Sequence, residues 1–184
     1  MKFKIIFIEW LPIGVTVSFL AVMAYGLVQQ TIRLSVNSEP AQIANDVASI
    51  LSQGVEPSYL IGGEKTEITK QLAPYVIVYG LDGKVAASSA SFDGQSPNVP
   101  QGILAEAKLK GEDRVTWQPR AGIRQALVAV SYNNGVVVSG KSLKEPEKLI
   151  GLIGRDSLIG WAATMLVSFA AVFAIHRSKL FAKL

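Results

Sequence analysis

The sequence contains no cysteine and only one histidine, His176. Without cysteine there can be no disulfide bond and no thiol chemistry, so the fold must rely on its apolar core. A lone histidine cannot build a metal site unaided, and it leaves the rest of the chain without the usual nucleophile–base pairs. No Ser-x-x-Lys spacing replaces those pairs. We therefore expect no enzymatic activity, no metal and no cofactor.

Charge is scarce over two long stretches. Residues 5–28, IIFIEWLPIGVTVSFLAVMAYGLV, carry one charged side chain, Glu9, and residues 158–175, LIGWAATMLVSFAAVFAI, carry none. At about 1.5 Å per residue, helices of these lengths reach roughly 27 to 36 Å, enough for the ~30 Å hydrocarbon layer of a bilayer. The pattern predicts two transmembrane helices, the first within residues 1–28 and the second at residues 157–176.

Excess positive charge lies at the two ends of the chain. Five basic residues flank the apolar stretches: Lys2, Lys4, Arg177, Lys179 and Lys183. Residues 29–157 hold 13 Lys or Arg and 13 Asp or Glu, so the middle is neutral. Short basic ends stay in the cytoplasm, which predicts a two-pass protein of the cell (inner, cytoplasmic) membrane with both termini inside. The extracytoplasmic domain would be residues 29–156 and the short basic tail residues 177–184. Because the isoelectric point near 9.3 comes from the membrane anchors, we expect no nucleic-acid binding.

A cleaved signal peptide is the alternative for the first stretch. Lys2 and Lys4 make a short basic leader, and AVMA offers small residues at a plausible cleavage site. The apolar core of a signal peptide usually has only about 7 to 15 residues, however, and this stretch is longer. Its length favours an uncleaved anchor.

Several side chains are expected at the level of the membrane surface. They are Glu9, Trp10, Trp161, His176 and Arg177. Tryptophan prefers this boundary, and a spanning helix that begins at Leu11 would carry Pro12 in its first turn, where proline is tolerated. Antiparallel helices would also bring Glu9 to a depth similar to that of His176 and Arg177, so a contact between them is a second hypothesis. A functional carboxylate inside the membrane is a third.

The central region predicts an α+β domain. Helical spacing of apolar residues predicts a helix at residues 38–53, and shorter helical segments are expected at residues 66–74 and 103–110. The predicted strands are residues 75–79, 85–88, 114–119, 123–132 and 136–143. Asp82-Gly83 is a strong hairpin turn between the first two strands. The hairpins indicate a mainly antiparallel five-stranded sheet with helices on one face.

The order of these elements resembles a known family. A long leading helix, the hairpin VIVYGLDGKVAASS and two flanking membrane helices make residues 30–150 similar to the PAS-like (Cache-type) sensor domains of bacterial receptors. The resemblance implies a five-stranded sheet whose concave face can hold a small ligand, commonly a metabolite carboxylate. It implies binding and adds no catalytic residues.

One motif points to a different function. Residues 135–142, GVVVSGKS, match the phosphate-binding pattern G-x-x-x-x-G-K-[ST] letter for letter. That loop must follow a strand, curl around phosphate and open a helix. Val136, Val137 and Val138 instead favour extended chain and follow a hairpin turn. We expect a strand here and no nucleotide binding.

Five side chains are candidates for binding a small anionic ligand. They are Tyr75, Tyr79, Trp117, Arg120 and Arg124. Arginine offers planar donors for a carboxylate, and tryptophan offers a stacking face. The alternative is structural: Arg114 would pair with Glu112 or Asp113, the aromatic residues would fill the core, and the other arginines would be solvated. Proximity in sequence does not show convergence on one pocket, so both hypotheses stay open.

Only nine residues follow Ile175, too few for a further domain. We therefore expect a sensor-like module for signal transduction without its own output domain, acting on a separate membrane protein such as a kinase, a transporter or a complex subunit. One alternative is a structural or accessory subunit of a membrane or envelope complex with no small-molecule ligand. Another is the input half of a longer receptor. Small residues that would allow close helix packing, and so a homodimer, are Gly14, Ser18, Gly160 and Ala163.

Overall fold

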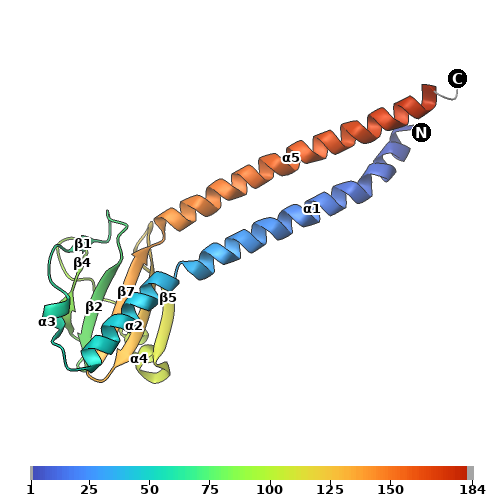
Figure 1. Ribbon diagram of the computed structural model, residues 1–184. Coiled ribbons are helices and arrows are strands. Elements are labelled where there is room, and N and C mark those ends of the chain that lie inside the picture. The colour runs from blue at the N-terminus through green and yellow to red at the C-terminus, as the bar shows by residue number, and fades with distance from the viewer. Residues whose placement is uncertain (1, 182–184) are drawn as a thin grey trace. The chain divides into compact units, whose positions relative to one another are not determined.

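The computed structural model describes residues 2–181, with side chains from residue 4 to residue 178 (Figure 1). Lys183, in the predicted basic tail, lies outside the described residues, and the side chains of Lys2 and Lys179 are not among those described. The chain divides into two compact units. One combines the two terminal segments, residues 1–31 and 148–184, and the other is residues 32–147.

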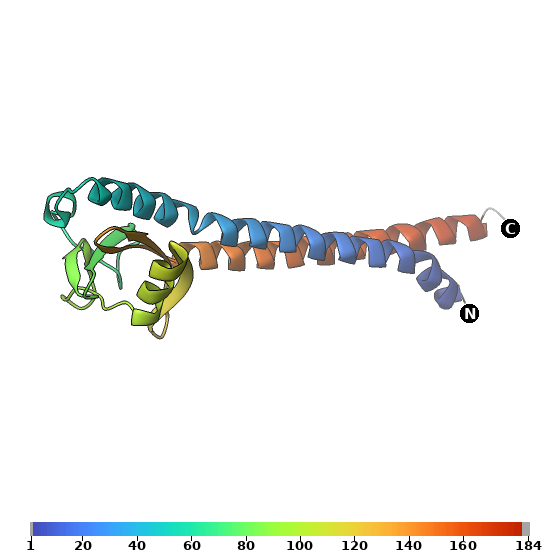
Figure 2. The same ribbon diagram turned by 90° about the horizontal axis from the view of Figure 1, so that it is seen from below.

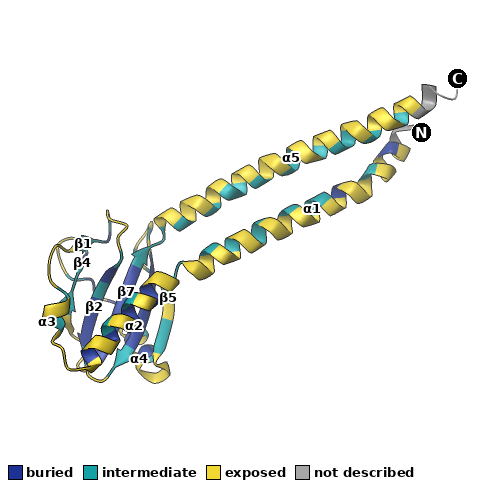
Figure 3. Ribbon diagram, in the orientation of Figure 1, coloured by how far each residue is buried: buried dark blue, intermediate teal, exposed yellow. Residues whose placement is uncertain are grey.

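Two long helices make up most of the terminal unit. They are α1 (Lys2–Ser35) and α5 (Lys144–Phe181). Each is long and apolar enough to cross a membrane. Most of their large apolar side chains are exposed (Figure 3), which is unfavourable in water. Because α1 begins at Lys2, Pro12 lies inside it and not in its first turn as predicted, and α1 bends close to its N-terminus (Figure 2).

A five-stranded antiparallel sheet forms the centre of the second unit. Its strands lie in the order β3 (Val85–Ser88), β2 (Tyr75–Gly80), β7 (Gly135–Ser142), β6 (Ile123–Tyr132) and β5 (Glu112–Arg120). The predicted strands, their antiparallel pairing and the α+β class are confirmed. Gly83 in the predicted β2–β3 turn has a φ of 73°, which glycine adopts without strain, and Asp82 Oδ1 accepts a hydrogen bond from the Lys84 N–H.

The remaining elements of this unit are short, apart from one helix. They are α2 (Ser38–Ser52), α3 (Pro57–Leu60), α4 (Gln101–Lys110), and the two-stranded parallel sheet of β1 (Thr66–Glu67) and β4 (Ala90–Ser91). The short helical turn predicted at residues 66–74 is present only in part. Residues 66–67 are β1 and pair with β4, and a single turn follows in which the N–H groups of Lys70 and Gln71 donate to the Glu67 carbonyl.

Helices cover both faces of the sheet. Alternate residues of a strand point to opposite faces. The face of Val78 and Val128 packs against α2, and the face of Ile77 and Leu127 packs against α4. We call these the α2 face and the α4 face. The sequence predicted helices on one face only, and this prediction was wrong. Central strands that are buried on both faces lose the alternation of apolar and polar residues that marks a half-exposed sheet.

Short connections join the sheet domain to the long helices. Two residues, Val36 and Asn37, separate α1 from α2, and only Leu143 separates β7 from α5. Residues 144–156, which the sequence placed between the sheet and the second apolar helix, are the first part of α5. The central strand and the second long helix therefore follow one another in the chain with one residue between them.

Candidate functional site

Three of the five predicted ligand-binding side chains lie on the α4 face. Tyr75 and Tyr79 of β2 belong to the buried cluster that includes Leu104 of α4, and Trp117 of β5 packs against the same cluster. The two tyrosines are buried and the tryptophan is half-buried. The structure thus brings these three aromatic residues to one side of the sheet.

The Tyr79 hydroxyl is engaged within the fold. It donates a hydrogen bond to the Pro97 carbonyl at 3.2 Å and accepts one from the Val99 N–H at 3.1 Å. Burial raises the pKa of Tyr79, and the bond from Val99 offsets part of this rise. Tyr79 therefore anchors the segment that leads into α4.

The Tyr75 hydroxyl is buried without a hydrogen-bond partner. Tyr75 is 2% exposed, and no described residue offers a partner to its hydroxyl. Burial, with a smaller contribution from Tyr79, raises the pKa of Tyr75, so the phenol stays neutral at physiological pH. Leaving such a group unpaired costs about 1–3 kcal/mol.

A second unpaired group lies on the same face. Gln125 of β6 is 1% exposed; its Nε2 donates to the Ile68 carbonyl at 3.3 Å, but its Oε1 has no partner among the described residues. Tyr75 stands opposite Gly140 on β7, and Gln125 stands opposite Ser142, two residues further along that strand. We call Tyr75 and Gln125 the buried polar pair. They place one unpaired hydroxyl and one unpaired carbonyl on either side of β7, at the same end of the sheet.

Gly140 makes room for the first member of this pair. A Cβ atom at Gly140 would lie 2.3 Å from Cζ and 2.4 Å from the hydroxyl oxygen of Tyr75, and 2.6 Å from Cδ2 of Leu127. The Tyr75 ring therefore lies over the backbone of β7, and its hydroxyl is held above the middle of the sheet.

Residues around β1 and β4 cover part of the α4 face, and Glu67 ties them together. Its carboxylate accepts hydrogen bonds from the Thr69 hydroxyl at 2.9 Å and from the Asp93 N–H at 3.3 Å. Desolvation raises the pKa of Glu67, but hydrogen bonds from Thr69, Ser91 and Asp93 outweigh it, so the pKa lies below its ordinary value. The ionised carboxylate thus stabilises the cover.

Arg120 contacts the same cover. Its guanidinium forms an ion pair with Asp93 and lies 5.0 Å from the centre of the Phe92 ring. Both charged groups are exposed, so solvent screens the pair and it contributes little to stability. Arg120 therefore lies beside the α4 face with a carboxylate of the protein as its partner.

Arg124 is not brought together with the buried polar pair. It forms an ion pair with Glu147 of α5. Arg114 pairs with Glu112, as the structural alternative predicted. Gln125 is the residue that sequence reasoning missed, and the signal for it was a single amide side chain at the start of the apolar run of β6.

The phosphate-loop pattern forms the central strand of the sheet. Residues 135–142 are β7, and their backbone pairs with β2 on one side and with β6 on the other. The expected strand is confirmed. Its amide groups serve the sheet and do not form the curled loop that phosphate binding needs.

Two reciprocal hydrogen bonds join α1 and α5. Trp10 Nε1 donates to Ser168 Oγ at 2.9 Å, and Trp161 Nε1 donates to Ser18 Oγ at 3.1 Å. Ser18 in turn donates to the Gly14 carbonyl at 2.8 Å. Each helix supplies one indole and one hydroxyl. Both tryptophans, predicted at the membrane surface, direct their N–H groups across the helix pair.

The predicted contact between Glu9 and His176 is present. His176 Nδ1 lies 3.6 Å from Glu9 Oε2, and Arg177 follows on the exposed surface of α5. Among the described residues, no group of three or more His, Asp or Glu side chains could hold a metal ion. The contact is therefore a pairing between helices.

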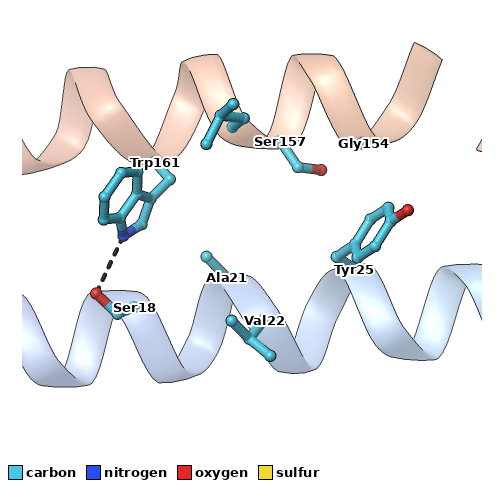
Figure 4. A pocket seen from close by; sticks show the side chains of 8 residues that line it. Ser18, Ala21, Val22, Tyr25, Gly154, Ser157 and Trp161 are labelled. Carbon is cyan, nitrogen blue, oxygen red and sulfur yellow. Dashed lines mark hydrogen bonds between the residues drawn. The ribbon is translucent and has the colours of Figure 1, made fainter. Parts of the chain in front are cut away.

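An apolar cleft lies between α1 and α5 (Figure 4). Its volume is about 310 Å³, and nearly all of its lining is apolar. Trp161, bonded to Ser18, stands at one end, and Tyr25, 3.3 Å from where a Cβ of Gly154 would lie, stands at the other. Ser157, on α5, lies between these two aromatic side chains.

Comparison with known proteins gives no match: no family model, curated protein or solved structure matches the chain. Neither the buried polar pair nor the apolar cleft can therefore be assigned by likeness. Both must be interpreted from their own chemistry.

Proposed function

We propose that this protein is a membrane-anchored sensor module of the PAS-like (Cache) type. Its two apolar helices lie in the cell membrane, its sheet domain lies outside the cytoplasm, and both termini lie inside. The sheet domain binds a small metabolite and acts on a separate membrane protein, such as a kinase, a transporter or a complex subunit. The protein itself catalyses no reaction.

The sheet supports the PAS-like assignment. It has the five strands that the resemblance implies, and all neighbouring strands are antiparallel. Its first strand, β2, lies between its hairpin partner β3 and the central strand β7. Helices cover both faces, and the residues around β1 and β4 add a second cover to the α4 face. A ligand would therefore be enclosed on the α4 face.

The observation that carries the proposal is the buried polar pair. Buried polar atoms are nearly always hydrogen-bonded, and exceptions call for a specific explanation. Here the Tyr75 hydroxyl can donate and the Gln125 Oε1 can accept, within an otherwise apolar cluster. A small metabolite that offers one acceptor and one donor, such as a hydroxy acid or an amino acid, would satisfy both groups.

Entry of such a ligand requires the cover of the α4 face to move. Glu67 and Arg120 hold this cover through contacts that are partly or largely exposed to solvent. Contacts of this kind are weak in water. Ile68 and Ala90 of the cover are buried in the same apolar cluster as the sheet, so opening also exposes apolar side chains.

The test is a thermal-shift screen of the full chain in lipid nanodiscs against hydroxy acids and amino acids. We expect at least one compound to raise the melting temperature, and the shift to vanish in Tyr75→Phe and in Gln125→Met. The matched control is Gln118→Met, which changes an exposed glutamine on β5 and should keep the shift. A panel without any shift, or a shift that survives both site substitutions, would refute the proposal.

A further inference from the structure

We infer that the cleft between α1 and α5 binds one acyl chain of a membrane phospholipid. The inference rests on the membrane anchoring proposed above. It concerns the terminal unit alone and is independent of the ligand of the sheet domain.

The chemistry of the cleft excludes water as its occupant. With a volume of about 310 Å³, the cleft has room for many waters. A buried water needs about two to four polar partners. Ser18 Oγ is already bonded to Trp161 and to the Gly14 carbonyl, and the remaining walls are mainly apolar. An empty cleft is also unfavourable, because its walls would lose their dispersion contacts.

The shape of the cleft fits a chain better than a helix. Along α1 it extends from Ser18 to Tyr25, which is about 10 Å at 1.5 Å per residue. The side chains of Trp161 and Tyr25 stand at its two ends (Figure 4). A partner helix is about 10 Å wide and packs along several turns, so this bracketed space is too short for one. A flexible hydrocarbon chain can enter it from the side.

The polarity of the cleft gives the chain a direction. Ala21, Val22 and Leu158 supply apolar walls, whereas the hydroxyls of Tyr25 and Ser157 lie toward the end that continues into the sheet domain. A phospholipid would place its chain against the apolar walls and its ester oxygens near these hydroxyls. In the proposed topology, this orientation matches a lipid of the outer leaflet.

Photolabelling of the full chain tests this inference. The protein is reconstituted in nanodiscs of phosphatidylcholine that carries a diazirine on its acyl chain, irradiated, and mapped by mass spectrometry. We expect adducts to concentrate on Ala21, Tyr25 and Ser157, the half-buried part of the lining. Ala21→Phe fills the cleft and should lower labelling of Ser157 several-fold. Leu20→Phe, which places the same aromatic ring on a neighbouring residue that is 56% exposed, should leave the pattern unchanged.

A second variant guards against loss of folding. Ser157→Phe fills the same cleft from α5 and should reduce labelling of Ala21 to a similar extent, with helicity by circular dichroism unchanged. Equal labelling of the cleft and of the exposed Val167, or labelling that neither filling variant lowers, would overturn the inference. Failure of the membrane anchoring itself is distinguishable, because neither helix would then be labelled at any position.

Discussion

The ring of Tyr75 lies over Gly140, its register partner on the neighbouring strand β7. This contact fixes where the buried hydroxyl can lie, because a side chain at residue 140 would occupy the space of the ring. The location of the candidate ligand site therefore depends on a glycine that itself offers no chemistry to a ligand.

Replacement of this glycine should destabilise the sheet domain. We expect Gly140→Ala to lower the free energy of unfolding by about 1–3 kcal/mol, the usual effect of overpacking a core. Chemical denaturation of the full chain in micelles measures it. Gly102→Ala in α4 is the control: nothing lies within 4 Å of its Cβ position, so it should raise stability by about 0.5–1 kcal/mol. Equal effects of the two substitutions would contradict the geometry.

The two buried tyrosines should respond differently to loss of the hydroxyl. Tyr79→Phe removes two hydrogen bonds and should destabilise the protein by about 1–3 kcal/mol. Tyr75→Phe removes an unpaired hydroxyl and should leave stability unchanged or raise it by about 1 kcal/mol, while it abolishes the ligand response. Melting curves of both variants without added compounds decide the matter, and a large loss of stability in Tyr75→Phe would show that its hydroxyl has a partner.

Glu67 should make the cover of the α4 face sensitive to acid. Its pKa is lowered in the folded protein, so its stabilising contribution is present above the ordinary value of 4.5 and is lost as pH falls through the folded pKa. Glu67→Gln should therefore lower the melting temperature at pH 7 but have a smaller effect near pH 3. The control is Glu64→Gln, an exposed carboxylate three residues earlier. A pH-independent effect of Glu67→Gln would rule out this role.

The bonds between the two long helices should show measurable coupling. A double-mutant cycle of Ser18→Ala and Trp161→Phe isolates one indole–hydroxyl contact, and Trp10→Phe with Ser168→Ala isolates the other. We expect a coupling energy of about 0.6 kcal/mol for each pair, and at most about 1.7 kcal/mol, as for hydrogen bonds between membrane helices. Unfolding of the full chain in a bilayer measures it. Additive effects within a pair would argue against that bond.

The absence of cysteine allows a direct test of topology. Asn133→Cys and Ser178→Cys each introduce one thiol at an exposed position, the first in the sheet domain and the second near the end of α5. In intact cells, a membrane-impermeant maleimide should label the first variant and should label the second only after permeabilisation. The reverse result would place the sheet domain inside the cell.

The sequence predicted the elements better than the site. Hairpin turns such as Asp82-Gly83 and the β-branched runs led to the correct strands, because local chemistry determines them. The second covered face was missed, since a strand buried on both sides and a strand buried on one side can have the same length and turn signals. The position of Tyr75 and Gln125 on either side of β7 was missed as well. It depends on the register of β2 and β6 against β7, and residues far apart in the chain determine that register.

The partners of the arginines were also only partly predictable. Arg114 and Glu112 are two residues apart on β5, so their ion pair followed from local spacing. Arg120 and Asp93 are 27 residues apart and meet only because the loop after β4 reaches the end of β5. Long-range contacts of this kind decide whether a charged side chain is free for a ligand.

The two indole–serine bonds also limit how the helix pair can move. Trp10 and Ser18 lie eight residues apart on α1, and Trp161 and Ser168 lie seven apart on α5, so the bonds are separated by about two helical turns. A piston-like slide of one helix past the other would break both bonds at once, whereas a tilt or twist of the whole pair would break neither. In the proposed membrane topology, a neighbouring protein would therefore contact these two helices as one rigid unit.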